Sequence, residues 1–151
     1  MSRWTNSSGF FSALRRWAQA GAARHEAEPL GLRGEKLAAK YLRRKGYRIL
    51  EHSHRQRRGE IDLIALHKKC IVFVEVKTWR SGTGGDPSEA VDLRKQKRLT
   101  RAALIYLKEK RVLDQPARFD VISIVWPESS EPTIRHFESA FEATGNGQLY
   151  G

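Results

Sequence analysis

The sequence has only one cysteine and lacks a long apolar run. These two features exclude several classes of protein. Cys70 has no second cysteine to pair with, which excludes an intramolecular disulfide and a thiolate zinc site. No apolar run approaches the ~20 residues of a membrane-spanning helix. None of the five histidines has the spacing of a zinc-ligand pair. We therefore expect no membrane span, and a reducing, cytoplasmic location is the default expectation.

Acidic residues are scarce relative to basic ones. The 151 residues include 28 Lys and Arg against 17 Asp and Glu, which gives a net charge of +11. Apolar residues make up 40% and charged residues 30%, as expected of one globular domain with an ordinary core. A small protein this basic is a candidate for a polyanionic partner, because contact with phosphates releases counterions. Nucleic acid is the partner we expect, although basic proteins also bind anionic membranes.

The start of the chain differs in composition from the rest. No acidic residue precedes Glu26, whereas arginine and serine recur. We predict a flexible extension over 1–29, one domain over 30–143 and a polar tail over 144–151. A mobile extension, an arm that binds membrane or nucleic acid, and a targeting segment remain open as interpretations of 1–29.

Residue spacing predicts one mixed α/β sheet with helices packed on it. Apolar residues recur at helical spacing from Leu32, and Gly46 is placed as a C-terminal cap. Asp86 and Asp92 each resemble the cap of a helix that reaches about Arg111. The expected strands are 47–50, two strands within 59–77, then 118–126 and a short strand at 133–137.

The charges alternate along the chain in blocks. Residues 33–58 carry a net charge of +8 and residues 94–118 carry +7, whereas residues 59–93 between them carry −2. The two basic blocks are either solvated helix faces or a surface that meets a phosphate backbone on both sides of an acidic centre. The candidate nucleic-acid contacts are Arg43, Arg44, Arg57, Arg58, Lys95, Lys97 and Arg101.

The acidic centre lies in a hairpin, "GEIDLIALHKKCIVFVEVK" (59–77). A turn at Lys68-Lys69 would place Asp62 opposite Glu75 and Glu60 opposite Lys77. Alternation would then put these charges on one face and Ile61 with the apolar residues on the other. Two facing carboxylates repel each other, and a divalent cation held between them would resolve the conflict.

A simpler interpretation of the same charges needs no metal. Lys77 could pair with Glu60 and Glu75 while Asp62 points into solvent. The metal interpretation has a chemical consequence, because a bound cation activates water and neutralises a scissile phosphate. A lysine beside it would stabilise the charge that develops in the transition state.

Several segments together resemble a known family. Asp62 followed by Glu75-Val76-Lys77 looks like the PD-(D/E)xK nuclease signature. The segments "RGEKLAAKYLRRKGYRIL", "GEIDLIA", "VFVEVK" and "RFDVISI" more specifically resemble the YraN-like family, which is related to Holliday-junction resolvases. The resemblance covers about 30–126 and implies a restriction-endonuclease-like fold, an α/β fold with a mixed central β-sheet flanked by helices.

The resemblance also implies roles for individual residues. Asp62 and Glu75 would hold Mg²⁺ or Mn²⁺ with the carbonyl of Val76, and Lys77 would be the catalytic lysine. Glu35 matches an acid that assists the metal in resolvase-type enzymes, or else forms a helix-face salt bridge. The sequence departs from the usual pattern at three positions, which carry Ser53, Ile61 and Trp79.

The expected activity is metal-dependent phosphodiester hydrolysis, on branched or single-stranded DNA. The alternatives are a nucleic-acid-binding module that cleaves slowly or not at all, and a structural protein with hairpin salt bridges. Because resolvase-like enzymes often act in pairs, the resemblance leaves a homodimer open.

Three further expectations concern polar residues outside the signature. Lys95 and Gln96 lie where the second helix could reach the active site, although solvated charge is the simpler interpretation. Asp120 is expected to orient Arg118. The histidines at 52, 54 and 67 are expected to be exposed polar residues rather than metal ligands.

Overall fold

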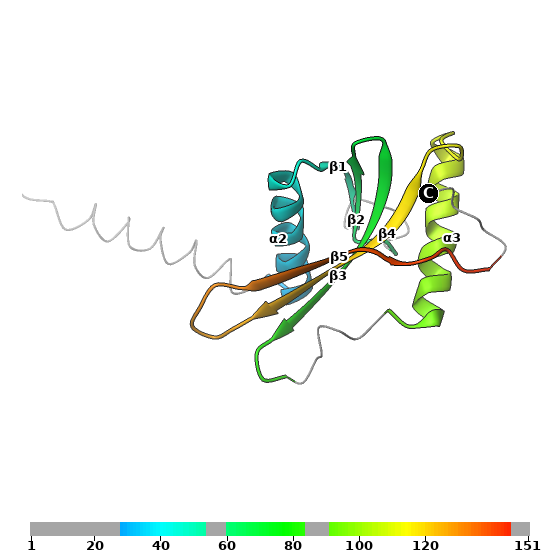
Figure 1. Ribbon diagram of the computed structural model, residues 1–151. Coiled ribbons are helices and arrows are strands. Elements are labelled where there is room, and N and C mark those ends of the chain that lie inside the picture. The colour runs from blue at the N-terminus through cyan, green and yellow to red at the C-terminus, as the bar shows by residue number, and fades with distance from the viewer. Residues whose placement is uncertain (1–27, 54–59, 84–90, 146–151) are drawn as a thin grey trace, which may run out of the picture.

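A computed structural model describes residues 28–53, 60–83 and 91–145 (Figure 1). The helix start expected at Asp86 and nearly all of the 1–29 extension lie outside these residues, as does most of the tail. The elements, in chain order, are α2 (Leu30–Arg44), β1 (Arg48–His52), β2 (Leu63–His67), β3 (Cys70–Arg80), α3 (Leu93–Glu109), β4 (Ala117–Trp126) and β5 (Thr133–Phe141). The expected order of helices and strands is confirmed, with a last strand longer than expected.

The strands form one mixed sheet in the order β1-β2-β3-β4-β5. All neighbouring pairs are antiparallel except β3 and β4, which are parallel and are joined through α3. The hairpin turn lies at Lys68-Lys69, with His67 opposite Cys70 and Ile64 opposite Phe73. The sequence-based turn and register are therefore correct up to Leu63. None of the described helices is long and apolar enough to cross a membrane.

Beyond Leu63 the hairpin opens into a fork. The last β2–β3 pair is Leu63 with Val74, whereas β3 continues to Arg80 and stays paired with β4 along its other edge. Asp62 ends the ladder, because its side chain accepts the backbone N–H of Val76 at 2.7 Å. The expected strand pairing of Glu60 with Lys77 is therefore wrong.

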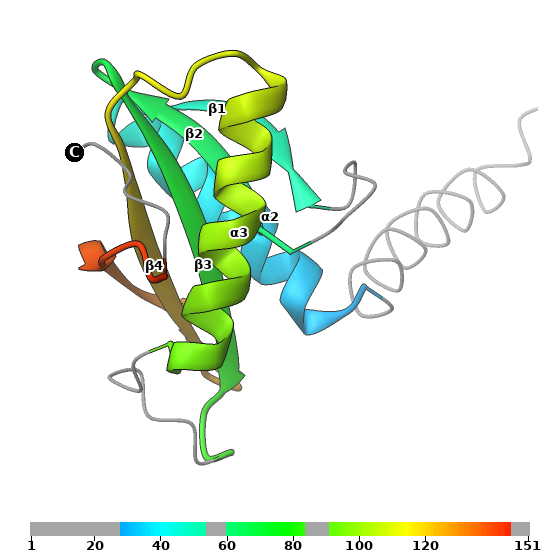
Figure 2. The same ribbon diagram turned by 90° about the vertical axis from the view of Figure 1, so that its right-hand side faces the viewer.

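Each face of the sheet packs against one helix, with α3 in front of the sheet and α2 behind it in Figure 2. Leu99, Ala103 and Leu107 of α3 join a buried apolar cluster that includes Phe73. The equivalent residues of α2 are Ala38, Ala39 and Leu42, which cover the other face. Each stripe recurs at three- and four-residue spacing, as an amphipathic helix on a sheet requires.

Ile61 corrects the expected alternation. It packs in the cluster under α3 with Ile64 and Phe73, not on the face that holds Leu63. Strict alternation would have put Ile61 with Leu63, but it applies only inside a regular strand. Since β2 begins at Leu63, the chain before it is free to turn Ile61 into the other core.

Glycine lets the first helix approach the sheet closely. Gly34 of α2 is buried, and a Cβ atom there would overlap the hydroxyl of Thr78 on β3. A larger residue would push the helix away from the strand, and Glu35, the next residue, would move with it. This contact therefore sets how far the start of α2 lies from the fork.

Candidate active site

The fork brings Asp62 next to β3. Its Oδ2 atom accepts the Val76 N–H at 2.7 Å, and its backbone carbonyl accepts the Ser53 N–H at 2.9 Å. The carboxylate is thus turned towards β3 and half-buried, rather than pointing into solvent. The metal-free interpretation of the hairpin is wrong in this respect.

Glu75 is the buried carboxylate of the fork, with 7% of its surface exposed. Its Oε1 atom lies 3.1 Å from the Lys95 ammonium of α3. Its Oε2 atom is buried and has no hydrogen-bond partner among the described residues. A buried carboxylate oxygen without a donor is costly, so this atom is the one in the site that most needs a cation.

The electrostatics of Asp62 agree with this geometry. The pKa of Asp62 is raised to about 7, first by burial and then by the negative charge of Glu75. The Val76 N–H and the Lys95 ammonium act in the opposite direction, and Glu35 adds to the rise. The carboxyl group therefore resists ionisation at the position where two other carboxylates surround it.

The first helix supplies Glu35 to the same place. Glu35 Oε2 accepts a hydrogen bond from the Ser53 hydroxyl at 2.8 Å, and the Ser53 backbone N–H binds the carbonyl of Asp62. Ser53 thus joins α2 to the fork. Sequence analysis noted Ser53 only as a departure from the family pattern, because its two partners come from separate parts of the chain.

The second helix supplies Lys95, as one of the two interpretations expected. Asp92 caps α3 by accepting the Lys95 backbone N–H at 2.8 Å, which fixes Lys95 in the first turn beside Glu75. Gln96 is turned elsewhere, since its amide donates to the Val91 carbonyl at 2.7 Å. Lys77 is half-buried and two residues beyond Glu75, so alternation puts both on the face that α3 covers.

The residues at the fork fit a hard divalent cation only as an open site. Within residues 28–53, 60–83 and 91–145, no group of three or more His, Cys, Asp and Glu side chains is placed to hold a metal ion. Two carboxylates and a backbone carbonyl are, however, the type of ligand that Mg²⁺ takes while keeping waters or binding substrate phosphate. Asp62, Glu75 and the carbonyl of Val76 could hold such an ion.

The expected nucleic-acid contacts do not all gather on one surface. Lys97 and Arg101 are exposed on α3, the helix that reaches Glu75. Arg43 and Arg44 are exposed at the last turn of α2, which covers the opposite face of the sheet. They lie ~12 Å along the helix axis from Glu35. Arg57 and Arg58 lie outside the described residues.

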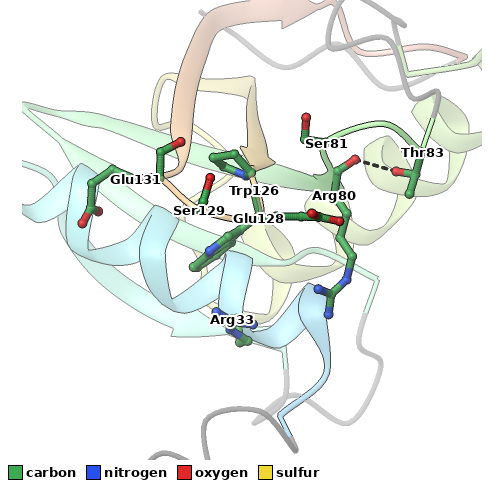
Figure 3. Close-up of a pocket in the computed structure, with 10 residues that line it drawn as sticks. Arg33, Arg80, Ser81, Thr83, Trp126, Glu128, Ser129 and Glu131 are labelled. Carbon is green, nitrogen blue, oxygen red and sulfur yellow. Dashed lines mark hydrogen bonds between the residues drawn. The ribbon is translucent and has the colours of Figure 1, made fainter.

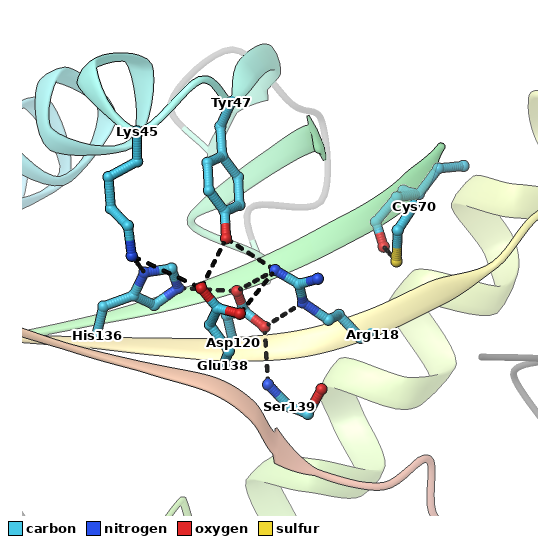
Figure 4. A network of polar contacts seen from close by, with 9 residues as sticks. Lys45, Tyr47, Cys70, Arg118, Asp120, His136, Glu138 and Ser139 are labelled. Carbon is cyan, nitrogen blue, oxygen red and sulfur yellow. Dashed lines mark hydrogen bonds and ion pairs between the residues drawn. The ribbon is translucent and has the colours of Figure 1, made fainter. Parts of the chain in front are cut away.

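A second polar network lies under the end of α2 (Figure 4). Asp120 is fully buried and binds Arg118 Nε at 2.9 Å, as expected from the sequence. It also lies 2.8 Å from His136 Nε2 and accepts the Ser139 backbone N–H at 3.0 Å. Arg118 in turn donates to the Tyr47 hydroxyl at 2.8 Å.

The donors around Asp120 overcome its burial. Burial by itself raises the pKa of Asp120, but the hydrogen bonds from His136, Arg118 and the Ser139 N–H together hold the pKa below its usual value. Every partner comes from the protein, so this network satisfies itself and needs no ligand. Sequence analysis missed His136 and Tyr47, since nothing in "TIRHF" or "GYRIL" indicates a partner on β4.

His67 corrects another expectation. It is half-buried, and its ring stacks on that of Tyr47 with 4.0 Å between centroids and 6° between planes. His52 is half-buried as well, and His54 lies outside the described residues. His67 was expected to be an exposed polar residue, yet the chain after α2 brings Tyr47 over it.

Comparison with known proteins places the chain in a family. The profile of the uncharacterised protein family UPF0102 matches residues 34–124. A UPF0102 protein of Rhodopirellula baltica is 51% identical over 130 residues, covering 83% of this chain and 78% of its own. A UPF0102 protein of Geobacter sulfurreducens is 47% identical over 122 residues, covering 81% and 95%. The chain belongs to the UPF0102 family.

Proposed function

We propose that the protein is a metal-dependent nuclease with a restriction-endonuclease-like fold, and that the fork between β2 and β3 is its active site. One observation carries the proposal. Within the part of the chain that the structure describes, the buried Oε2 atom of Glu75 has no hydrogen-bond donor, and it lies near Asp62, whose pKa rises to about 7. Buried carboxylates with a strongly perturbed pKa are characteristic of functional sites.

The protein's own residues have distinct tasks in this proposal. Asp62, Glu75 and the Val76 carbonyl would hold the ion, which supplies Lewis acidity and a more acidic water when bound. Lys77 stabilises negative charge on the phosphoryl oxygens in the transition state. Lys95 pairs with Glu75 at 3.1 Å and keeps the buried charge compensated before the ion binds. Glu35 fixes the edge of the site through Ser53.

The sheet and the charge support the rest of the proposal. The hairpin that carries Asp62 and Glu75-Val76-Lys77 opens at these residues, so they border a gap in the strand pairing rather than a closed ladder. The net charge of +11 favours a nucleic acid as the substrate. DNA is the proposed substrate, and a homodimer and a cytoplasmic location stay predictions.

The direct test is cleavage of duplex, single-stranded and four-way DNA with Mn²⁺ or Mg²⁺ and with chelator. The wild type should cleave at least one substrate only when metal is present. Glu75→Gln and Lys77→Ala should both lose cleavage, whereas only Glu75→Gln should lose metal affinity, since an ammonium is not a ligand. Glu109→Gln, at the exposed end of α3, is the matched control and should cleave like the wild type.

A second candidate function is nucleic-acid binding without cleavage. One observation favours it: Lys95 already neutralises part of the charge of Glu75 without any metal. In that case Lys95 would be a permanent partner of Glu75 rather than one that yields to an ion. Salt-sensitive DNA binding with no metal-dependent product would support this function over the first.

A further inference from the structure

A cavity of about 800 Å³ lies at the ends of β3 and β4, beside the start of α2 (Figure 3). Three parts of the chain line it. They are Arg33 of α2, the end of β3 from Arg80 onward, and the end of β4 from Trp126 into the loop that leads to β5. Nothing in the proposed cleavage chemistry uses these residues. The volume is in the range of natural ligand sites.

A tryptophan stacked against an arginine forms the centre of the cavity. The guanidinium carbon of Arg33 lies 4.4 Å from the centre of the Trp126 ring. Arg80 is paired with Trp126 in the β3–β4 register, and the Ser81 N–H donates to the Trp126 carbonyl at 2.9 Å. Trp126 and Arg33 are half-buried and lie in regular elements, whereas Arg80 is exposed at the end of β3.

Apart from Pro127, the other lining residues are polar. Ser129 and Ser130 supply hydroxyl groups, and Glu128 and Glu131 supply carboxylates that can accept hydrogen bonds. Arg80 and Glu131 lie on opposite sides of Trp126 in the view of Figure 3. Two arginines and two glutamates together would repel a bare anion as much as attract it. An apolar peptide would find too few apolar contacts, so the site suits a flat, polar ligand with one anionic end.

The cavity is joined to the fork through two elements. Arg80 lies three residues beyond Lys77 on β3, which is ~10 Å along the strand. Arg33 lies two residues before Glu35 on α2. The cavity borders the face of the sheet that α2 covers, because Trp126 packs against the cluster of Ala38 and Leu42. Because Glu75 and Lys77 are on the face that α3 covers, a chain of nucleotides would reach the cavity by passing round the edge of β3 that β2 leaves unpaired beyond Val74.

We propose that this cavity binds one unstacked base of a single-stranded nucleic acid whose scissile part lies at the fork. The inference rests on the proposed nuclease function and names the form of its substrate. The base stacks on Trp126 in the manner of single-strand-binding proteins, and Arg33 adds a cation–π contact. Arg80 binds the adjacent phosphate, and the carboxylates accept hydrogen bonds from amino groups on the base edge. Fully paired duplex has no free base to offer.

The test compares binding of a fluorescent single-stranded oligonucleotide and a blunt duplex of the same sequence, as DNA and as RNA, in chelator. Trp126→Ala should weaken single-strand binding by about 5- to 100-fold, the range of one stacked base, and leave duplex binding nearly unchanged. Trp126→Phe should restore most of the loss. Arg80→Ala should lower the slope of log affinity against log salt by about 0.7, since one phosphate contact is lost from a single strand.

Two further comparisons separate this inference from the function on which it rests. Arg135→Ala removes an exposed charge from β5 and controls for net charge. It should lower the affinities for single strand and duplex equally and only slightly. Because Trp126 also packs on the core, Arg80→Ala is the second, exposed probe if Trp126→Ala is unstable.

The outcomes distinguish the two proposals. If these variants lose affinity for single strands but not for duplex, the cavity is supported even when no nucleic acid is cleaved. Absence of cleavage would count only against the nuclease function. If the protein cleaves with metal but both variants keep the single-strand affinity of the wild type, the proposed base site in the cavity is wrong. The proposed nuclease function would then still hold. Absence of wild-type binding to single strands also overturns the cavity.

Discussion

Two aspartates, Asp120 on β4 and Asp62 at the fork beside β3, have opposite surroundings. Asp120 is fully buried and receives hydrogen bonds from Arg118, His136 and the Ser139 N–H, which lower its pKa. Asp62 is half-buried, accepts the Val76 N–H, and has a pKa raised to about 7 by burial and by Glu75. One carboxylate is supplied with donors by the fold, and the other is placed beside a second carboxylate.

The difference shows how burial alone fails to identify a functional site. Both groups pay for desolvation, but the donors around Asp120 outweigh the penalty, whereas the Val76 N–H and Lys95 do not outweigh it at Asp62. A carboxylate whose pKa is lowered by donors stabilises the folded state at neutral pH, whereas one whose pKa is raised weakens it. We infer that Asp120 holds the fold together and that Asp62 is kept for a ligand. The predictions below test this contrast.

The largest stability effect is expected at Asp120. Asp120→Ala leaves the half-buried Arg118 guanidinium and the buried His136 ring without their acceptor and should lower the free energy of unfolding by about 3–5 kcal/mol. Urea denaturation at pH 7 measures the change. Glu138→Ala, which removes a half-exposed carboxylate of the same network, should lower it by less than about 1 kcal/mol. Equal losses in the two variants would remove the structural role assigned to Asp120.

Substitution of Asp62 should change the stability of the protein in the opposite direction to substitution of Asp120. Asp62→Asn removes a charge from beside Glu75 while its side-chain oxygen can still accept the Val76 N–H. We expect the melting temperature without metal to rise by about 3–5 °C at pH 8, which corresponds to ~1 kcal/mol. The same variant should lose metal-dependent cleavage. Loss of stability comparable to that of Asp120→Ala would mean that Asp62 is structural.

The pH dependence of the two aspartates sharpens the contrast. The folded pKa of Asp62, about 7, lies above its unfolded value of about 4, so ionisation of Asp62 lowers stability as pH rises through this range. The stabilisation by Asp62→Asn should therefore be present at pH 8 and absent near pH 4. The folded pKa of Asp120 is lowered, so its contribution is present above pH ~4 and is lost as pH falls below that value. Denaturation curves of the variants from about pH 2 to pH 8 measure both trends, and parallel curves would contradict the assignment.

A smaller effect is expected where α2 meets β3. Gly34→Ala should displace the helix start from Thr78 and with it Glu35. We expect cleavage to fall by about 10- to 100-fold, as for the loss of residues that orient metal ligands, with a modest loss of stability. Gly31→Ala on the same helix, where a Cβ has open space, is the matched control and should behave like the wild type.

The local parts of this structure were predictable from the sequence. The turn at Lys68-Lys69 sets the hairpin register, and Asp92 caps α3, because both depend on neighbouring residues. The Arg118–Asp120 pair was likewise expected, since its members lie two residues apart on one face of β4. Sequence alternation therefore suffices wherever the partners share one regular element.

The long-range contacts were not predictable in this way. The fork at Asp62 depends on Ser53 and on the approach of α2, and the Asp120 network needs Tyr47 and His136 from other elements. Strict alternation misplaced Ile61 and Glu60 because it assumed that the strand continued through Asp62. The buried Glu75 oxygen without a donor among the described residues also results from tertiary packing, and no pattern of residues in the sequence predicts it.

The most direct test is a calorimetric titration of Mn²⁺ into the wild type, Glu75→Gln and the control Glu109→Gln at pH 7 and pH 8. The wild type and the control should bind Mn²⁺ with equal affinity, and more tightly at pH 8, because Asp62 must release its proton to become a ligand. Glu75→Gln should bind at least about tenfold more weakly, since a ligand charge has been removed. Equal affinity of wild type and Glu75→Gln would contradict the metal site at the fork.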